Sequence, residues 1–303
     1  MSTPNPKDLP FNSPVVPEMV DGGKTIQFQC RKGIACWNAC CSNIDISLTP
    51  YDILRLKRRL GLASAQFLQQ YAVPYEMEKD GIAGIKMKPV EGGSACQFMT
   101  PEGCSVYEDR PTACRYYPVA LLSMRKQDEY TDTHSYALVK EAHCLGHQEP
   151  RSLTIDAYRV EQGLTDYDAQ GRGWRQLVLK KMSSGPTVGK PSVKSRQLFF
   201  MTCYDLDTFR AFVDSGPFQE LYDVPEAERQ AMPGDSLESE EALMQFGFRF
   251  LRQVMFGEES IPLHQAAAEK RRAQVREKAR QAEREAAAKL ARDEDPRDEG
   301  FED

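Results

Sequence analysis

The stretch QCRKGIACWNACCSN, residues 29–43, decides how the first half of this chain is organised, because it places four cysteines within twelve residues. A second group lies in SACQFMTPEGCSVYEDRPTACRYYP, residues 94–118, and a further cysteine lies in AHCLGH, residues 142–147. The eight cysteines are Cys30, Cys36, Cys40, Cys41, Cys96, Cys104, Cys114 and Cys144. Such a concentration of an uncommon residue indicates one dedicated site. Cys203, which lies apart in an apolar run, is expected to be a buried packing residue.

The composition is that of a soluble protein, with 41% apolar and 28% charged residues among 303. The net charge of −6 gives no general case for nucleic-acid binding, so any contact with a polyanion has to be local. No apolar run reaches the roughly 20 residues of a membrane span, and the N-terminus lacks a signal-peptide pattern. We therefore expect a cytoplasmic protein, in which clustered cysteines serve metal binding or catalysis and not disulfides.

The pattern along the chain predicts an α+β fold with four parts. Residues 1–24, with five prolines, form an extended or disordered arm, and residues 25–150 form an irregular, metal-stapled cysteine-cluster domain. Residues 151–263 form a mainly helical domain. Residues 264–303 form a long charged helix followed by an acidic tail.

In the cysteine-rich part we expect short strands and two helices capped by clear signals. Thr49 followed by Pro50 marks a helix start, and Gly61 marks its end. A second helix runs from Ser64 to Tyr71, and Pro111 opens a helical turn that carries Cys114. Strands are expected in KTIQFQC (residues 24–30), within 44–48 and 82–90, with two more between 119 and 139 around the polar turn RKQDE, while residues 103–107 are expected to form a short strand or turn.

In the second half of the chain, the pattern of apolar residues predicts amphipathic helices over 154–163, 165–182, 207–215 and 236–256. The last of these is expected to be the spine of this half. The apolar run QLFFMTCY, residues 197–204, is interpreted as a buried strand. Residues 264–292 have strong helix propensity but no apolar face to bury, which is typical of a solvated single helix.

Four thiolates around one centre suit zinc or an iron–sulfur cluster. Five, three and zero residues separate the first four cysteines, a spacing that matches neither zinc ribbons nor bacterial ferredoxins. Adjacent side chains in an extended backbone point to opposite sides, so Cys40 and Cys41 are expected to serve different metal atoms, or only one of them is a ligand. The cysteine groups should then interleave within roughly 10 Å, with Pro111 starting a turn whose free amides face the thiolates.

Four further side chains bear on the site. His143 and His147 flank Cys144 and are alternative ligands, although packing roles are the simpler interpretation. Arg110 and Arg115 are expected to offset the negative charge of a thiolate site. The alternative for both arginines is ordinary salt bridges to Glu102, Glu108 or Asp109.

The segments FQCRKGIACWNACCSNIDISLTPYDILRL and CQFMTPEGCSVYEDRPTACRYYP resemble the YkgJ-type cysteine-cluster family, described as zinc- or iron-chelating proteins with a C-x-x-x-C-x-x-C-C-like signature. The chain is also similar to the cysteine-rich part of flagellin lysine N-methylases. The resemblance covers roughly residues 25–150 and implies ligation by the eight clustered cysteines, with Cys144 as the last member.

Three hypotheses about function follow. The first is a metal-binding protein, with an iron–sulfur cluster ahead of zinc as cofactor because the vicinal pair suits a polynuclear site. The second is a protein-lysine methyltransferase that uses S-adenosylmethionine. The lack of a recognisable adenosyl-binding glycine loop counts against this second hypothesis. The third is an adaptor or assembly factor that recruits a protein partner through the helical region or residues 264–292. The sequence itself leaves open whether the protein is an enzyme.

Overall fold

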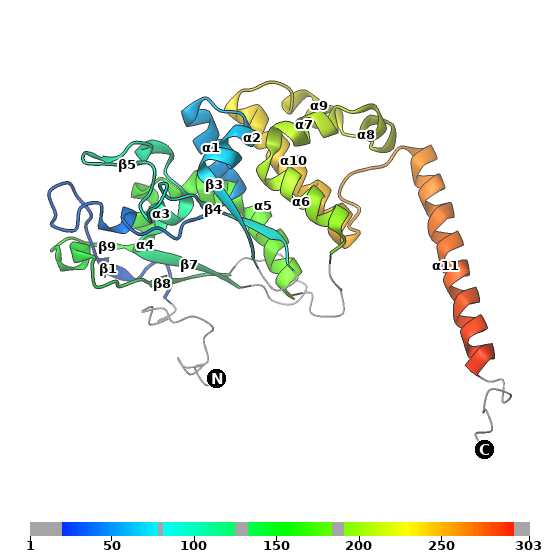
Figure 1. The fold of residues 1–303 in the computed structure, drawn as a ribbon, viewed down its shortest axis with the longest axis horizontal. Coiled ribbons are helices and arrows are strands. Elements are labelled where there is room, and N and C mark those ends of the chain that lie inside the picture. The colour runs from blue at the N-terminus through cyan, green and yellow to red at the C-terminus, as the bar shows by residue number, and fades with distance from the viewer. Residues whose placement is uncertain (1–19, 78–80, 125–132, 184–190, 294–303) are drawn as a thin grey trace, which may run out of the picture.

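The computed structural model describes residues 20–77, 81–124, 133–183 and 191–293 (Figure 1). The strands are β1 (Thr25–Gln27), β2 (Ser47–Leu48), β3 (Ala72–Glu76), β4 (Ala83–Met87), β5 (Met99–Thr100), β6 (Gly103–Cys104), β7 (Val119–Met124), β8 (Thr133–Leu138) and β9 (Ser152–Thr154). The α-helices are α1 (Pro50–Leu60), α2 (Ser64–Tyr71), α3 (Thr112–Tyr116), α4 (Ile155–Glu161), α5 (Leu164–Ser183), α6 (Val193–Tyr204), α7 (Leu206–Val213), α8 (Gly216–Leu221), α9 (Glu226–Ala231), α10 (Leu237–Phe256) and α11 (Gln265–Asp293). Short strands followed by helices confirm the α+β class.

The described strands form small antiparallel sheets, with the order β2-β4-β3 in one and the pairs β1-β9, β5-β6 and β7-β8 in the others. In the β1-β9 pair, Thr25 lies opposite Thr154. This pairing brings together the strand that precedes the first cysteine loop and the strand that follows Cys144. In the cysteine-rich part strands form where they are predicted, but β1, β2, β4 and β6 are each shorter than the predicted ranges, and β3, β5 and β9 were not predicted. The polar turn between β7 and β8, most of the N-terminal arm and the acidic tail lie outside the described residues.

Helix α1 begins and ends where its capping signals predict. The Thr49 hydroxyl accepts a hydrogen bond from Asp52 N at 3.1 Å, and the Asp52 carboxylate accepts one from Thr49 N at 2.8 Å, which forms a capping box. Gly61 ends the helix with a left-handed φ of 65°. Leu56 and Ile53 are buried in the core, so α1 fixes the first half against the rest of the molecule.

The predicted strand over residues 197–204 is wrong, because this run belongs to α6. A continuous apolar run has no period that separates a buried strand from a buried helix. The deciding signal is the Ser192 hydroxyl, which accepts a hydrogen bond from Ser195 N at 3.1 Å and caps the helix. On α10, a Cβ at Gly247 would lie 2.7 Å from Thr202 Cγ2, so a glycine there allows α6 to pack closely against α10.

Helix α10 is the spine of the second half, as its pattern predicts, and ends at Gly257 with a φ of 72°. Buried apolar side chains from both halves form one continuous cluster, in which α1 packs against α5, α6 and α10. The division into four parts at residues 24, 150 and 263 remains a prediction. No helix in the described ranges combines the length and the apolar character that a membrane span requires.

A buried ionic network joins α1 to the helical half. Lys57 Nζ lies 2.6 Å from Glu240 Oε1 and 2.8 Å from Asp207 Oδ1, while Arg58 Nη1 lies 2.7 Å from Glu240 Oε2. The side chains of Lys57 and Glu240 are only 5% and 6% exposed. Because a buried charge needs its partner, this network depends on every member being present.

Replacing Lys57 by Met is expected to lower the free energy of unfolding by about 3 kcal/mol, at the lower end of the range for breaking a buried ion pair, since Arg58 still pairs with Glu240. Urea denaturation followed by circular dichroism measures the loss. The matched control is Lys88→Met at an exposed lysine, which should change the stability by less than about 0.5 kcal/mol. Equal stability of the two variants would contradict the structural role of the network.

Candidate metal centre

A left-handed residue shapes the first cysteine loop. Asn38 has a φ of 65°, the only positive φ among the described residues other than glycine. Its side-chain amide donates a hydrogen bond to Thr100 O at 2.7 Å. The chain then forms a 3-10 turn over Ala39–Cys41, which carries the vicinal cysteines. Asn38 therefore both turns the loop and ties it to the β5-β6 hairpin, whose second strand ends at Cys104.

The first and second cysteine groups are in direct contact. Cys96 N donates a hydrogen bond to Cys41 O at 2.8 Å, and the Ser94 hydroxyl donates one to Ser42 O at 3.0 Å. A Cβ at Gly103 would lie 2.9 Å from the Trp37 ring, so the indole packs on a glycine whose φ is +130°. The expectation that the two groups share one small volume is supported by these contacts.

The last cysteine is joined to the same loop. Leu145 N donates a hydrogen bond to Cys36 Sγ at 3.3 Å, and Gln29 N donates one to Gly146 O at 3.0 Å. The side chains of Arg31 and Glu149 form an ion pair at 3.0 Å across the same junction. The segment that contains Cys144 is therefore fixed beside the segment that contains Cys30 and Cys36.

Cys114 is placed by α3, whose N-terminus is held by Asp52. Asp52 Oδ1 accepts hydrogen bonds from Thr112 N and Thr112 Oγ1, each at 2.7 Å, and the carboxylate is fully buried. The expectation that the amides at this helix start face the thiolates is therefore wrong for Thr112, because its amide is taken by Asp52. Asp52 lies in the first turn of α1, and its second role depends on a contact with Thr112, 60 residues away.

Cys40 lies at the centre of the thiol set. Five other thiols have raised pKa values. Burial is the largest cause in four of them, and the hydrogen bond with Cys40 is the largest cause for Cys41. The charge of Cys40 raises the pKa further in all five. They are Cys30, Cys41, Cys96, Cys104 and Cys114. Cys36 and Cys144 also act on Cys30. Thiols from four segments of the chain therefore lie within electrostatic range of one another.

The vicinal pair differs from the geometry expected of an extended backbone. Because Ala39–Cys41 form a 3-10 turn, the sulfurs of Cys40 and Cys41 do not diverge but lie 3.9 Å apart. Two thiolates bound to one tetrahedral zinc at about 2.3 Å are about 3.8 Å apart. The structure removes the geometric reason for assigning the two sulfurs to different metal atoms, and that assignment stays a prediction.

The surroundings of the sulfurs suit thiolate ligands. Backbone N–H groups of Phe98 and Met99 bond to Cys96 and act to lower its pKa, although burial is larger and raises it overall. Val106 N–H acts in the same way on Cys104, where burial again prevails. Burial raises the pKa of Cys30 to about 11. The hydrogen bond with Cys41 lowers the pKa of Cys40 to about 7. Ligation by the other thiols must therefore displace protons.

The two arginines have different surroundings. Burial raises the pKa of Cys30 and Cys104, and the charge of Arg110 opposes it at both thiols. Arg115 instead donates hydrogen bonds to Arg110 O at 3.0 Å and Gln162 O at 2.7 Å. In the described part of the chain neither arginine pairs with a carboxylate, since Asp109 is bound by Arg55. Arg110 donates hydrogen bonds to Tyr107 O at 2.8 Å and to Gln162 Oε1 at 2.7 Å, and Arg115 holds the backbone beneath it. That either guanidinium offsets thiolate charge stays a prediction.

The histidines and Cys203 have packing or surface roles. His147 Nε2 lies 3.0 Å from Val139 O, and its ring packs against Phe28 with centroids 5.2 Å apart. His143 is exposed and lies 3.5 Å from Glu141. Cys203 is buried in α6, among the helices of the second half.

We expect His143→Ala and His147→Ala to retain full metal content, because cysteines surround the site, His147 Nε2 is bonded to Val139 O, and His143 is exposed beside Glu141. His147→Ala should lower the free energy of unfolding by about 1 kcal/mol through lost packing, whereas His143→Ala should not. Elemental analysis of purified protein measures the metal, and its loss from either variant would place that imidazole among the ligands.

The cysteine sulfurs are chemically suited to zinc or iron, but they are not arranged as the coordination shell of one ion. Among the described residues, no three Cys, His, Asp or Glu side chains are positioned to hold one ion. The nine cysteines are free thiols. Soft sulfur donors, N–H groups directed at sulfur and the nearby charge of Arg110 all suit a thiolate centre. Metal binding by these residues therefore has to draw the loops together.

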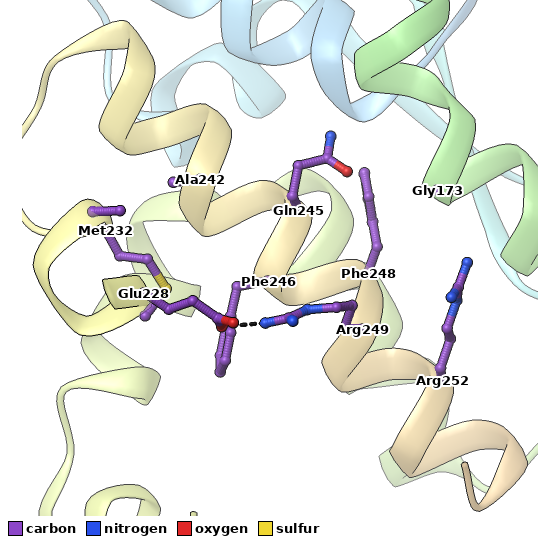
Figure 2. Close-up of a pocket in the computed structure, with 10 residues that line it drawn as sticks. Gly173, Glu228, Met232, Ala242, Gln245, Phe246, Phe248, Arg249 and Arg252 are labelled. Atoms are coloured by element: carbon purple, nitrogen blue, oxygen red, sulfur yellow. Dashed lines mark hydrogen bonds and ion pairs between the residues drawn. The ribbon is translucent and has the colours of Figure 1, made fainter. Parts of the chain in front are cut away.

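A separate cavity of about 360 Å³ lies in the helical half, where α5, α9 and α10 meet (Figure 2). Figure 2 shows the Arg249 guanidinium paired with the Glu228 carboxylate beside an apolar wall that includes Phe246. Gln245 donates hydrogen bonds to Gln170. None of the residues that line the cavity is a cysteine, and these polar groups bond within the protein. We assign it to helix packing.

Comparison with known proteins gives one match. Residues 29–145 match the model of the CxxCxxCC family, which is described as a "Putative zinc- or iron-chelating domain". The matched segment is about two-fifths of the chain and contains all eight clustered cysteines. No curated protein and no solved structure matches the chain. The YkgJ name and the similarity to flagellin lysine N-methylases stay predictions from the sequence.

Proposed function

We propose that residues 29–145 bind metal through the eight clustered cysteines, with an iron–sulfur centre ahead of zinc as the occupant, and that the protein acts in the cytoplasm. The observation that carries the proposal is the set of short contacts that bring the cysteine segments together: Cys40 Sγ lies 3.9 Å from Cys41 Sγ, Cys96 N donates a hydrogen bond to Cys41 O at 2.8 Å, and Leu145 N donates one to Cys36 Sγ at 3.3 Å. A polynuclear centre makes use of both vicinal thiols and of more than four ligands. The reducing cytoplasm keeps free thiols available for ligation.

We further propose two ligand groups that meet at the vicinal pair. The first contains Cys30, Cys36, Cys40 and Cys144, and the second contains Cys41, Cys96, Cys104 and Cys114. The hydrogen bond from Leu145 N to Cys36 Sγ and the repulsion of Cys30 by Cys36 and Cys144 support the first group. The hydrogen bond from Cys96 N to Cys41 O at 2.8 Å supports the second.

The surrounding residues position and charge-balance these thiols. When bound, an iron–sulfur centre supplies one-electron transfer, whereas zinc supplies a structural cross-link. Asn38 and Asp52 fix the loop and the helix that carry Cys41 and Cys114. The backbone N–H groups of Phe98 and Met99 at Cys96, and of Val106 at Cys104, would stabilise negative charge on these sulfurs, and the charge of Arg110 would do so at Cys30 and Cys104.

Anaerobic purification followed by metal and sulfide analysis tests the proposal. We expect a brown protein with broad visible absorbance and with iron and acid-labile sulfide in stoichiometric amounts. A colourless protein that carries only zinc would contradict the iron–sulfur centre while leaving thiolate chelation in place. A protein without either metal after reconstitution would contradict chelation itself.

The proposed ligand groups are tested by comparing Cys36→Ser with Cys114→Ser in the reconstituted protein. If there are two separate groups, Cys36→Ser should lose the metal of the first group and keep that of the second. Cys114→Ser should do the reverse. If the centre is single, both variants should lose all of it. Equal and complete losses would therefore contradict the grouping and not the metal binding.

A further inference from the structure

Helix α11 carries four arginines at a constant spacing of four residues, Arg272, Arg276, Arg280 and Arg284, here called the arginine stripe. All four residues are exposed, and no ion pair in the described part of the chain involves them. Residues four apart on an α-helix lie on nearly the same face and are about 6 Å apart along the axis. The stripe therefore presents four guanidinium groups along about 18 Å of the helix.

The stripe is not explained by the stability of α11 itself. An isolated helix is stabilised when opposite charges lie three or four residues apart and destabilised when like charges lie four apart. Arg272 and Arg280 have a glutamate three residues away, whereas Arg276 and Arg284 have no acidic residue at either spacing. The stripe contains three successive like-charged pairs at the spacing of four. The helix has nine basic and five acidic residues, a net charge of +4 in a chain whose net charge is −6. This local concentration of positive charge points to an external polyanion.

The base of α11 is anchored, while its length is free of the body. His264 N donates a hydrogen bond to Leu221 O at 3.1 Å, and Asp223 N donates one to Pro262 O at 2.9 Å. These bonds fix the start of the helix to the end of α8. Figure 1 shows α11 extending away from the other helices beyond this point. A large partner can therefore approach the arginine stripe without contact with the cysteine-rich half.

We propose that α11 docks in the major groove of duplex DNA, with the arginine stripe against the phosphates of a flanking strand. A helix with its side chains is about 10–12 Å across, which fits the roughly 12 Å width of the B-DNA major groove. The major groove of duplex RNA is too narrow and deep for this mode. Guanidinium groups bind phosphate oxygens in bidentate geometry. The interaction is local and independent of the metal centre.

Fluorescence anisotropy with a labelled 20-base-pair DNA duplex tests the proposal on the full chain. Neutralising about four phosphates predicts an affinity that falls on the order of 100-fold between 50 mM and 200 mM salt. In the double variant Arg276→Gln with Arg280→Gln, the slope of log affinity against log salt should decrease by about 2. Replacing all four arginines by Gln should remove nearly all of the salt dependence.

Two controls separate the stripe from net charge. Lys88→Gln with Lys194→Gln removes the same charge as the double variant from exposed positions on the body and should leave the slope unchanged. Replacing the four arginines by Lys keeps the charge and should preserve the slope. Equal loss in both double variants would overturn the proposal, as would stronger binding of a matched RNA duplex. Failure of the wild-type chain to bind duplex DNA at 50 mM salt would also overturn it, in favour of an acidic protein surface.

Discussion

Cys114→Ser is expected to release metal and to make residues 25–150 sensitive to proteolysis. Cys114 lies on α3, and its charge interactions reach Cys96, Cys104 and Cys40, so its loss removes a donor from the middle of the second group. The cysteine-rich half is built from short strands and loops, so the free energy of metal binding is also free energy of folding there. Limited trypsin digestion with elemental analysis measures both effects.

The matched control is Cys203→Ser, which changes the same atoms in a buried cysteine of α6. We expect this variant to keep its metal and its protease-resistant first half, although burying a hydroxyl costs about 1–3 kcal/mol of stability. A Cys114→Ser protein with full metal content and unchanged digestion would show that Cys114 is not a ligand. If only Cys203→Ser lost its metal, the metal site would lie in the helical half and not among the clustered cysteines.

Local signals in the sequence predicted the ends of α1 and α10, but α6 was predicted as a strand and α8 and α9 were not predicted. Thr49, Pro50 and Gly61 mark the limits of α1, and Gly257 marks the end of α10, because capping depends on residues within one turn of the helix end. The strand predicted over 197–204 failed because an apolar run carries no period, and packing against α10 selects the helix. Local patterns therefore determine ends, while burial on all sides leaves the element type ambiguous.

The membership of the cysteine set was also visible in the sequence, but its geometry was not. The divergence expected for Cys40 and Cys41 assumed an extended backbone, whereas the left-handed Asn38 leads into a 3-10 turn. Asn38 bonds to Thr100, 62 residues away. Such long-range contacts set the local conformation, and no short window of sequence contains both partners.

Asp52→Ala is expected to lower the free energy of unfolding by about 3–5 kcal/mol, which makes it the largest effect away from the thiols. The carboxylate is fully buried and accepts hydrogen bonds from Thr49 N, Thr112 N and Thr112 Oγ1. Its removal leaves three partly buried donors without this acceptor, and each fully buried unsatisfied donor would cost about 1–3 kcal/mol. Because Asp52 holds α3 against α1, the helix that carries Cys114 should lose its fixed position.

Urea denaturation of the metal-free and metal-loaded protein measures the effect of Asp52→Ala, together with the rate at which a chelator removes metal. We expect faster metal loss and a metal-free form that unfolds at lower urea. Asp52→Asn keeps one oxygen acceptor and should be intermediate, while Asp166→Ala, at an exposed first-turn position of α5, should cost less than about 1 kcal/mol. If Asp52→Ala lowered stability without changing the rate of metal loss, α3 would be held in place by contacts other than Asp52, and the link from the α1 capping box to the position of Cys114 would fail.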